Sequence, residues 1–423
     1  MPKREALRMK KLLALLLCAI IAVSASGCIP IRITLYPATD EQIIERESKI
    51  TKFGFSNSDD DKFIEEVLTA DELRNWENPY GKYSSYVLYK SLSNRDEKLI
   101  YKALEYAMVN SYKKICIDDK LGVRQSAIES IAQFLSLDTP FLEQNLMMIV
   151  VENVANFYNY KAEDGRDVSV LLRCSAIYLK NFTEELWESK MEALREAEKI
   201  YKELDCGEEG IELAEKIYRY VATSIEYNPY ESDEGIYQGN YAPFLYDAFI
   251  TKKTHCDGFT NALSLLYSMA GFEQVEKNIP GHTFNCVKIE GKWYNMDATW
   301  GSLIPDNATT MGAGPYFAFP TYLQNDKHDF FMYYPTCRDG YYMDADATLK
   351  SCSDEDFFTT ACKAFKSHNN EWTMILVEHY DKDEFLAQVQ KLSDYLDVDI
   401  VYLASYTIYG KTILYIINDE VYD

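Results

Sequence analysis

The sequence predicts an α+β protein of several parts, and three stretches of the chain carry this prediction. Apolar residues recur at helical spacing between residues 70 and 137. A helical pattern that begins at Cys256 precedes two strand-like runs joined by a turn at residues 290–291. Helix-like and strand-like segments then alternate from residue 355 to 417. We therefore expect the Cys256 helix to pack on an antiparallel sheet, between a largely helical N-terminal domain and a small α/β C-terminal region.

The N-terminus has the pattern of an export signal. Five basic residues precede an apolar run over residues 12–23, which is shorter than the roughly 20 residues that a membrane-spanning helix needs. The run leads into Ala25-Ser26-Gly27-Cys28, which resembles the lipobox at which bacterial lipoproteins are cleaved and lipidated. We expect a signal peptide over residues 1–27 and a lipid anchor on Cys28 at the outer face of the cell membrane. Val23-Ser24-Ala25 also fits an ordinary signal peptidase, which would leave the protein exported and unanchored.

The remaining domain boundaries follow changes in residue pattern. Residues 28–61 are polar without a sustained period, which is typical of a tether. Residues 62–207 combine helical segments with two β-rich segments that predict a small hairpin. Residues 208–330 hold the Cys256 helix and the two strands that follow it. Residues 331–423 form the predicted α/β C-terminal region.

Charge and cysteine content limit the partners and cofactors of the chain. The 67 acidic residues against 43 basic ones give a formal net charge of -24, and such a surface repels a phosphate backbone. Nucleic acid is therefore not an expected partner. The ten cysteines form no close C-x-x-C pair, so we expect no zinc cluster and no metal cofactor. Cys337, Cys352 and Cys362 are close enough in sequence for one disulfide in an exported protein, but the sequence leaves the pairing open.

Cys256 has the local setting of a nucleophile. It lies at the start of a predicted helix, where free N–H groups and the helix dipole favour a thiolate over a thiol. Gly258 lets the backbone approach closely just after it. His255, beside the nucleophile, is interpreted as a loop residue whose side chain points elsewhere, with a second base as the alternative.

The predicted hairpin over residues 282–300 places a histidine near a carboxylate. If the strands fold symmetrically about the turn at residues 290–291, His282 lies opposite Thr299 and Asp297 is its diagonal neighbour. Diagonal neighbours are about 7–8 Å apart between backbones, within reach of a side-chain hydrogen bond. A carboxylate that holds one imidazole nitrogen fixes the tautomer of the ring and stabilises its cation. The hairpin alone therefore predicts a base and the group that orients it.

Three blocks of this region resemble, in order, the signature of the transglutaminase-like superfamily. They are Cys256-Asp257-Gly258-Phe259, Gly281-His282-Thr283-Phe284-Asn285, and Asp297-Ala298-Thr299-Trp300 preceded by Gly291-Lys292-Trp293-Tyr294. The resemblance covers about residues 208–305 and implies a papain-like fold. It implies a catalytic triad in which Cys256 is the nucleophile, His282 shuttles the proton and Asp297 orients the histidine. Thr283-Phe284 stands where Ala-Trp is common in the family, which suggests a reshaped cleft.

The resemblance also implies the kind of reaction. We expect an extracytoplasmic cysteine enzyme that acts on a protein, peptide or cell-wall peptide through a thioester. Hydrolysis, by a protease or amidase, is expected before cross-linking, because water is abundant and no residue pattern marks an amine-acceptor site. The alternative is a non-catalytic scaffold lipoprotein that keeps the fold to bind peptide or cell wall. The complete set of three residues favours the enzyme, because a scaffold has no physical need for all of them.

Overall fold

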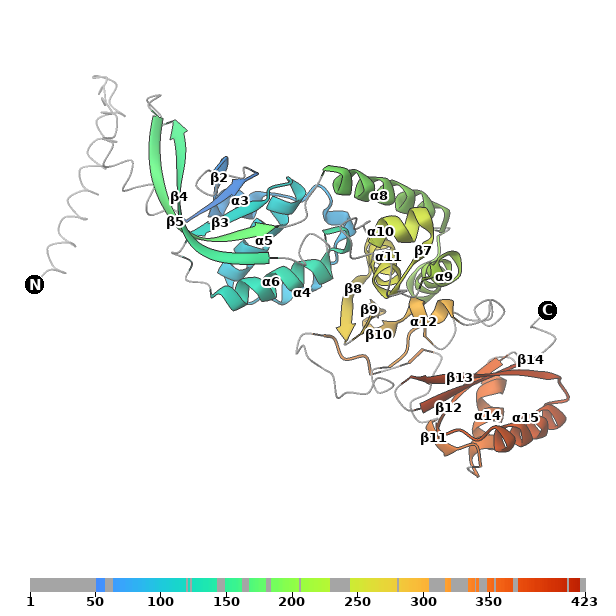
Figure 1. Cartoon of the computed structure of the whole chain (residues 1–423). Coiled ribbons are helices and arrows are strands. Elements are labelled where there is room, and N and C mark those ends of the chain that lie inside the picture. Colours follow the sequence, from blue (N-terminus) through green and yellow to red (C-terminus); the bar gives the residue numbers. More distant parts are fainter. Residues whose placement is uncertain are drawn as a thin grey trace, which may run out of the picture. The chain divides into compact units, whose positions relative to one another are not determined.

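The computed structural model of the 423-residue chain contains helices and sheets in every part that it describes (Figure 1). The described residues are 51–57, 64–118, 121, 124–142, 149–161, 167–179, 184–204, 207–228, 244–279, 281–303, 316–320, 334–338, 340–341, 348–353, 355–367, 372–408 and 411–418. The predicted signal peptide, Cys28 and most of the predicted tether lie outside them. The mixed helix and sheet content agrees with the expected α+β class.

Five strands form an N-terminal sheet: β1 (Lys52–Ser56), β2 (Glu66–Thr69), β3 (Lys114–Asp118), β4 (Ile149–Lys161) and β5 (Asp167–Leu179). Their spatial order is β2-β1-β3-β5-β4, and β1 pairs antiparallel with both of its neighbours. β1 lies within the segment expected to be a tether, yet all its residues are buried, because Phe53 and Phe55 enter the core. The folded part therefore begins earlier than predicted, and the expected small hairpin is β4 and β5 within a larger sheet.

Four helices belong to the same part of the chain as this sheet, and a buried carboxylate joins two of them. They are α3 (Ala70–Asn75), α4 (Val87–Ser91), α5 (Arg95–Val109) and α6 (Gln125–Asp138), with single turns at Gly81–Tyr83 and Pro140–Leu142. Asp138, at the end of α6, accepts hydrogen bonds from the backbone N–H groups of Leu88 and Tyr89, at 2.9 Å each. These N–H groups belong to the first turn of α4 and have no partner within that helix. Asp138 therefore fixes the start of α4 against the end of α6.

The central part of the chain carries the Cys256 helix, α11 (Cys256–Met269), against a three-stranded antiparallel sheet. The sheet has the order β10-β9-β8, formed by β8 (Glu273–Ile279), β9 (His282–Ile289) and β10 (Lys292–Met296). Around them lie α8 (Glu184–Leu204), α9 (Gly210–Ser224), α10 (Phe244–Tyr246), a π-helical turn (Asp247–Thr251), α12 (Ala298–Ser302) and the short parallel pair β6 (Glu226–Tyr227) and β7 (Lys253–Thr254). Because α11 supplies a long apolar face, its residues from Phe259 to Tyr267 are buried.

One hydrophobic core joins the N-terminal helices to the central sheet. It includes Leu104 of α5, Phe141, Leu263 of α11 and Val287 of β9, all of them fully buried. The boundary expected near residue 208 therefore does not separate two independent cores. A fragment of residues 208–330 would expose apolar surface that the N-terminal part now covers.

The C-terminal region has its own sheet and its own core. Its elements are β11 (Thr348–Ser351), α14 (Phe357–Ser367), β12 (Trp372–His379), α15 (Lys382–Leu396), β13 (Ile400–Ile408) and β14 (Lys411–Asn418). The sheet order is β11-β12-β14-β13, parallel between β11 and β12 and antiparallel elsewhere. Both helices lie on one face of this sheet (Figure 1) and bury Phe357 and Phe385 against it. The helices and strands from α14 to β14 lie where the sequence predicted them, whereas β11 lies in a stretch for which no element was predicted.

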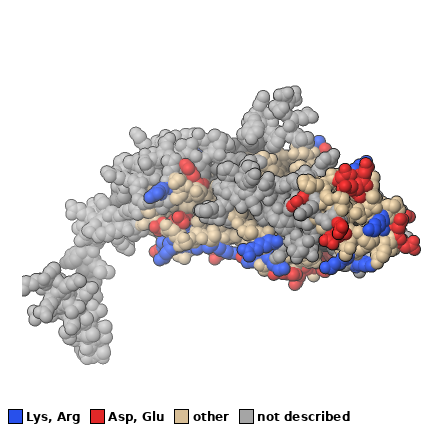
Figure 2. Space-filling model, turned by 90° about the horizontal axis from the view of Figure 1, so that it is seen from below, with Lys and Arg blue, Asp and Glu red and all other residues tan. Residues whose placement is uncertain are grey.

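Figure 2 shows that Lys and Arg side chains lie among Asp and Glu side chains on the described part of the face in view. That face carries no single large basic patch. Among the described residues, no helix is long and apolar enough to cross a membrane.

Candidate active site

Cys256 is the first residue of α11 and is half-buried. His255 is in the N-cap position of this helix: its Nδ1 atom lies 3.2 Å from the backbone N–H of Asp257 and accepts that N–H when the ring is neutral. Position 258 requires glycine for a steric reason, since a Cβ atom there would lie 2.1 Å from Oγ1 of Thr254. The first turn of α11 therefore packs directly on β7, and this close contact fixes where the thiol points.

The β9–β10 hairpin has the predicted register. Ile289 pairs with Lys292, and the pairing continues to Asn285 opposite Met296. Glu290 and Gly291 both have positive φ angles, of 51° and 84°, as a tight two-residue hairpin turn requires. The turn predicted from these two residues is therefore confirmed.

The second predicted strand ends earlier than expected, and this changes one neighbour of His282. β10 stops at Met296, and Asp297 caps α12 by accepting the backbone N–H of Trp300 at 3.0 Å. The N–H of Asp297 itself donates to the carbonyl of Tyr316, a residue outside the hairpin. Thr299 thus belongs to a helix, and the prediction that it lies opposite His282 in a ladder was wrong.

The structure nonetheless brings His282 and Asp297 into direct contact. Nε2 of His282 lies 2.6 Å from Oδ2 of Asp297, whose side chain is almost completely buried. The other carboxylate oxygen holds the N–H of Trp300, so each oxygen has its own donor. The backbone carbonyl of Asp297 accepts the hydroxyl of Tyr218 at 3.1 Å, and Tyr218 is fully buried. Asp297 is therefore fixed through its side chain and its backbone.

Two aromatic rings confine the imidazole of His282. The ring of Phe284 stacks on it with centroids 5.9 Å apart, and the ring of Trp300 meets it edge-on at 6.0 Å. Trp300 is 44% exposed, so it forms part of the rim of the site instead of the core. With Nε2 engaged by Asp297, Nδ1 is the ring nitrogen left to face the thiol.

The thiol of Cys256 interacts with the rings of both His255 and His282. Burial raises the pKa of Cys256, but these two interactions outweigh burial and bring it from 9.0 down to about 7. Burial lowers the pKa of His282, whereas the charge and hydrogen bond of Asp297 outweigh it and raise that pKa to about 10. A thiolate beside an imidazolium is therefore the favoured state of this pair above neutral pH.

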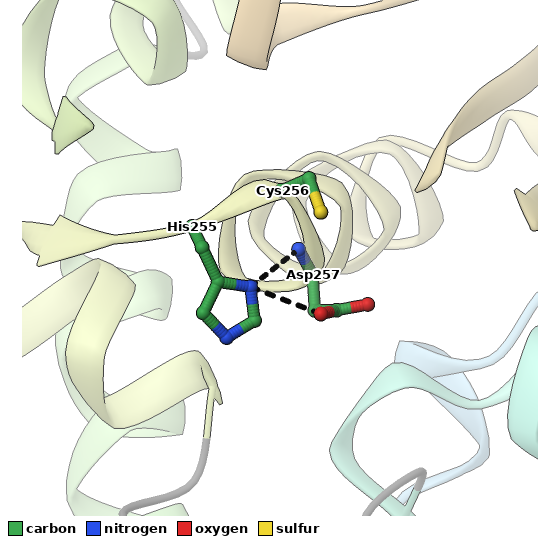
Figure 3. A group of neighbouring side chains, drawn as sticks. All are labelled: His255, Cys256 and Asp257. Atoms are coloured by element: carbon green, nitrogen blue, oxygen red, sulfur yellow. Dashed lines mark hydrogen bonds and ion pairs between the residues drawn. The ribbon is translucent and has the colours of Figure 1, made fainter. Parts of the chain in front are cut away.

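From the sequence, His255 is interpreted as a loop residue whose side chain points away from the site, and the structure places that side chain differently. Its side chain is 6% exposed, and Nδ1 lies 2.9 Å from Oδ2 of Asp257 (Figure 3). Burial lowers its pKa, but hydrogen bonds to Asp257 and Cys256 outweigh burial and raise it to about 9. The sequence signal was present, because a histidine directly before a helix-starting cysteine occupies the capping position. Tyr218 was also missed, and only the tertiary fold places it beside Asp297.

One group of side chains in the described part of the chain has metal-binding composition. Ligand atoms of His255, Cys256 and Asp257 lie within 4.8 Å of one another, and thiolate, imidazole and carboxylate are zinc ligands. Metal binding would require His255 to lose its proton, and its raised pKa opposes this at neutral pH. We therefore interpret the group as part of the thiol site.

Five other cysteines are buried: Cys116, Cys286, Cys337, Cys352 and Cys362. The sulfur atoms of Cys337 and Cys286 lie 3.9 Å apart, and both contact Oδ1 of Asn295. Cys352 and Cys362 lie in the separate C-terminal core. Cys337 therefore lies beside Cys286 of β9, a partner that its position in the sequence did not suggest.

Comparisons with known proteins give partial similarity. No protein-family model matches the chain. It is 28% identical to mouse kyphoscoliosis peptidase over 118 residues, which is 24% of this chain and 17% of that protein. It is 30% identical to human kyphoscoliosis peptidase over 80 residues, 15% of this chain and 12% of that protein. The chain thus spans less than a fifth of the length of these relatives, and the similarity to peptidases is local.

A solved structure from Cytophaga hutchinsonii, described as a candidate cysteine protease, also resembles part of the chain. The match has 13% identity, covers 36% of this chain and 64% of that one, and has a TM-score of 0.21. A likeness this low supports no argument about the fold.

Proposed function

We propose that this chain is an extracytoplasmic transglutaminase-like cysteine enzyme with a papain-like core that acts on peptide-type amides through a thioester. One observation carries the proposal. The thiol of Cys256, at a helix N-terminus, interacts with the ring of His282, whose Nε2 is held 2.6 Å from Asp297. The nucleophile, the base and the group that orients the base are thus linked in the spatial order that amide-cleaving cysteine enzymes require. The local similarity to proteins named as peptidases is consistent with this chemistry.

The first half-reaction forms the thioester. The Cys256 thiolate attacks the amide carbonyl, a C–S bond forms, and the carbonyl electrons move to oxygen. The backbone N–H of Cys256 is in the first turn of α11 and can donate to that oxyanion. His282 then gives its proton to the departing amine as the C–N bond breaks. Asp297 keeps the ring in place throughout, because its carboxylate stays bound to Nε2.

The second half-reaction releases the acyl group. Neutral His282 takes a proton from an incoming water, whose oxygen attacks the thioester carbonyl. Collapse of the tetrahedral intermediate expels the Cys256 thiolate and restores the starting ion pair. We favour water as the acceptor over an amine, because water is abundant and no described feature marks an amine-binding site. A protein, peptide or cell-wall peptide outside the cell is the proposed substrate.

The proposed location rests on the N-terminal sequence. A signal peptide over residues 1–27 would direct export, and lipid on Cys28 would hold the protein at the outer face of the membrane. Both lie outside the described residues.

A substrate screen tests the proposal. The secreted protein would be incubated with peptide libraries and cell-wall fragments, with Cys256→Ala as the matched control, and products would be identified by mass spectrometry. We expect new amine and carboxylate ends from the parent protein and none from Cys256→Ala. Binding of the same fragments by both proteins, with no product from either, would instead indicate the scaffold.

Faster labelling of Cys256 by iodoacetamide than of other cysteines would not by itself show that its thiol is activated, so a stricter control is needed. Cys116, Cys286, Cys337, Cys352 and Cys362 are buried, so Cys256 would react faster than these five for reasons of access alone. The informative comparison is the pH dependence of Cys256 alkylation in the parent and in His282→Ala. We expect the midpoint to rise in the variant, because the thiolate loses one of its two imidazole partners.

A further inference from the structure

A second imidazole–carboxylate pair lies beside the sulfur of Cys256. Nδ1 of His255 is 2.9 Å from Oδ2 of Asp257, and the ligand atoms of His255, Cys256 and Asp257 all lie within 4.8 Å of one another (Figure 3). Asp257 is 28% exposed in its side chain, while His255 is buried. The thiol thus interacts with two rings, His282 held by Asp297 and His255 held by Asp257.

The contacts of Nδ1 in His255 accommodate both protonation states of the ring. Nδ1 lies 3.2 Å from the backbone N–H of Asp257 and 2.9 Å from the carboxylate of the same residue. One nitrogen cannot accept and donate at once. The protonated ring donates to the carboxylate, whereas the neutral ring accepts the backbone N–H and caps α11. A change of charge on His255 therefore requires no movement of the ring.

The groups around His255 favour its cation. Asp257 and the Cys256 thiolate contact it directly, and the carboxylate of Asp247, in the π-helical turn, interacts with it electrostatically. The ring of Phe244 meets it edge-on at 5.0 Å and limits access of water. His282 is the opposing cation, and it also interacts with Cys256. Two carboxylates and a thiolate favour the protonated form of His255, and one imidazolium opposes it. The electrostatic balance therefore favours a charged His255.

We propose that His255, held by Asp257, is a second catalytic residue whose imidazolium contacts and stabilises the Cys256 thiolate. The proposal rests on the function proposed above and adds a division of labour between the two histidines. His282 gives and takes a proton in each half-reaction. His255 keeps its proton, so its positive charge acts whenever the sulfur is negative: before attack on the amide, and when collapse of the second tetrahedral intermediate breaks the C–S bond.

His255→Asn separates this charge from the capping role. Asparagine is a preferred N-cap residue, so its side-chain oxygen can still accept the N–H of Asp257, but it carries no charge. We would measure the rate of Cys256 alkylation by iodoacetamide from pH 5 to 10, using mass spectrometry of the Cys256 peptide. We expect the midpoint to rise above the parent value of about 7 and the rate at pH 7 to fall about tenfold.

Two further variants complete the test. Asp257→Asn should move the midpoint less than His255→Asn does, because a weaker His255 cation raises the pKa of Cys256 while loss of the Asp257 charge lowers it. In His255→Asn/His282→Ala the thiol should titrate above an ordinary cysteine, because burial and the charge of Asp257 then act without an opposing imidazole. Thermal unfolding of each variant shows whether α11 is still formed.

The outcomes distinguish failure of this inference from failure of the proposed function. If His255→Asn keeps the parent midpoint while His282→Ala raises it and abolishes turnover, His255 is only a helix cap and the inference is overturned. If His255→Asn raises the midpoint, but no amide is cleaved by the parent, the role of His255 toward the thiolate stands and the proposed function fails.

Discussion

Replacing Asp297 by asparagine or alanine separates its two structural roles. The carboxylate faces two donors, Nε2–H of His282 and the backbone N–H of Trp300. An asparagine has only one side-chain oxygen, so whichever way its amide turns, an NH₂ group faces one of the donors. Alanine removes both acceptors. The asparagine variant therefore removes the negative charge that faces His282 and leaves one acceptor, whereas alanine removes the charge and both acceptors.

The expected losses follow from the kind of hydrogen bond that is removed. A hydrogen bond to a charged group is worth about 1.5–3 kcal/mol, which corresponds to about a 10- to 150-fold fall in kcat/KM for Asp297→Asn. Asp297→Ala should fall at least as far and should also lower the free energy of unfolding by about 1 kcal/mol, since α12 loses its cap. Residual turnover is expected in both, because Cys256 and His282 remain.

Steady-state kinetics on a peptide from the substrate screen and urea unfolding give the two quantities. The alkylation midpoint of Cys256 supplies a third, and it should rise in both variants, because an imidazole without its carboxylate is a weaker cation. An Asp297→Asn variant with parental kcat/KM and an unchanged midpoint would refute the role of Asp297 in orienting His282.

Four other outcomes are expected. Turnover should be bell-shaped in pH, with limbs near the pKa values of Cys256, about 7, and His282, about 10. Burial raises the pKa of Asp138 from 3.8 to about 6, so its contribution to stability is complete below pH 3.8 and is lost as the pH rises through 6. Over this range the free energy of unfolding should fall by about 2–3 kcal/mol, and Asp138→Asn should abolish this pH dependence. Gly258→Ala should slow Cys256 alkylation and destabilise the fold by about 1–3 kcal/mol, because its Cβ would overlap Thr254. Cys28→Ala should move the protein from membranes into the medium in a fractionation assay, and unchanged association would contradict the anchor.

The hairpin shows how far local sequence can predict this site. A two-residue turn with positive φ at Glu290 and Gly291 fixes the register, and the register can be counted outward from the sequence alone. The end of the second strand could not be predicted in this way. The N–H of Asp297 pairs with Tyr316, and this contact depends on a segment that comes later in the chain.

Longer-range contacts account for the other differences. β1 has only five residues, and its partner β3 lies about sixty positions away, so no local period marks the five-stranded sheet. The orientation of His255 depends on Phe244 and on the π-helical turn that precedes it. Capping preference alone could place this residue at the helix start, but it could not show which way the ring faces.

Detection of the acyl-enzyme tests the central claim most directly. The parent protein and Cys256→Ala would be mixed with an activated peptide ester, quenched in acid, and compared by intact and peptide mass. The account predicts one acyl group on Cys256 of the parent, removed by hydroxylamine as a thioester is, and none on Cys256→Ala. Equal acylation of the two proteins, or acylation of the parent at another residue, would contradict it.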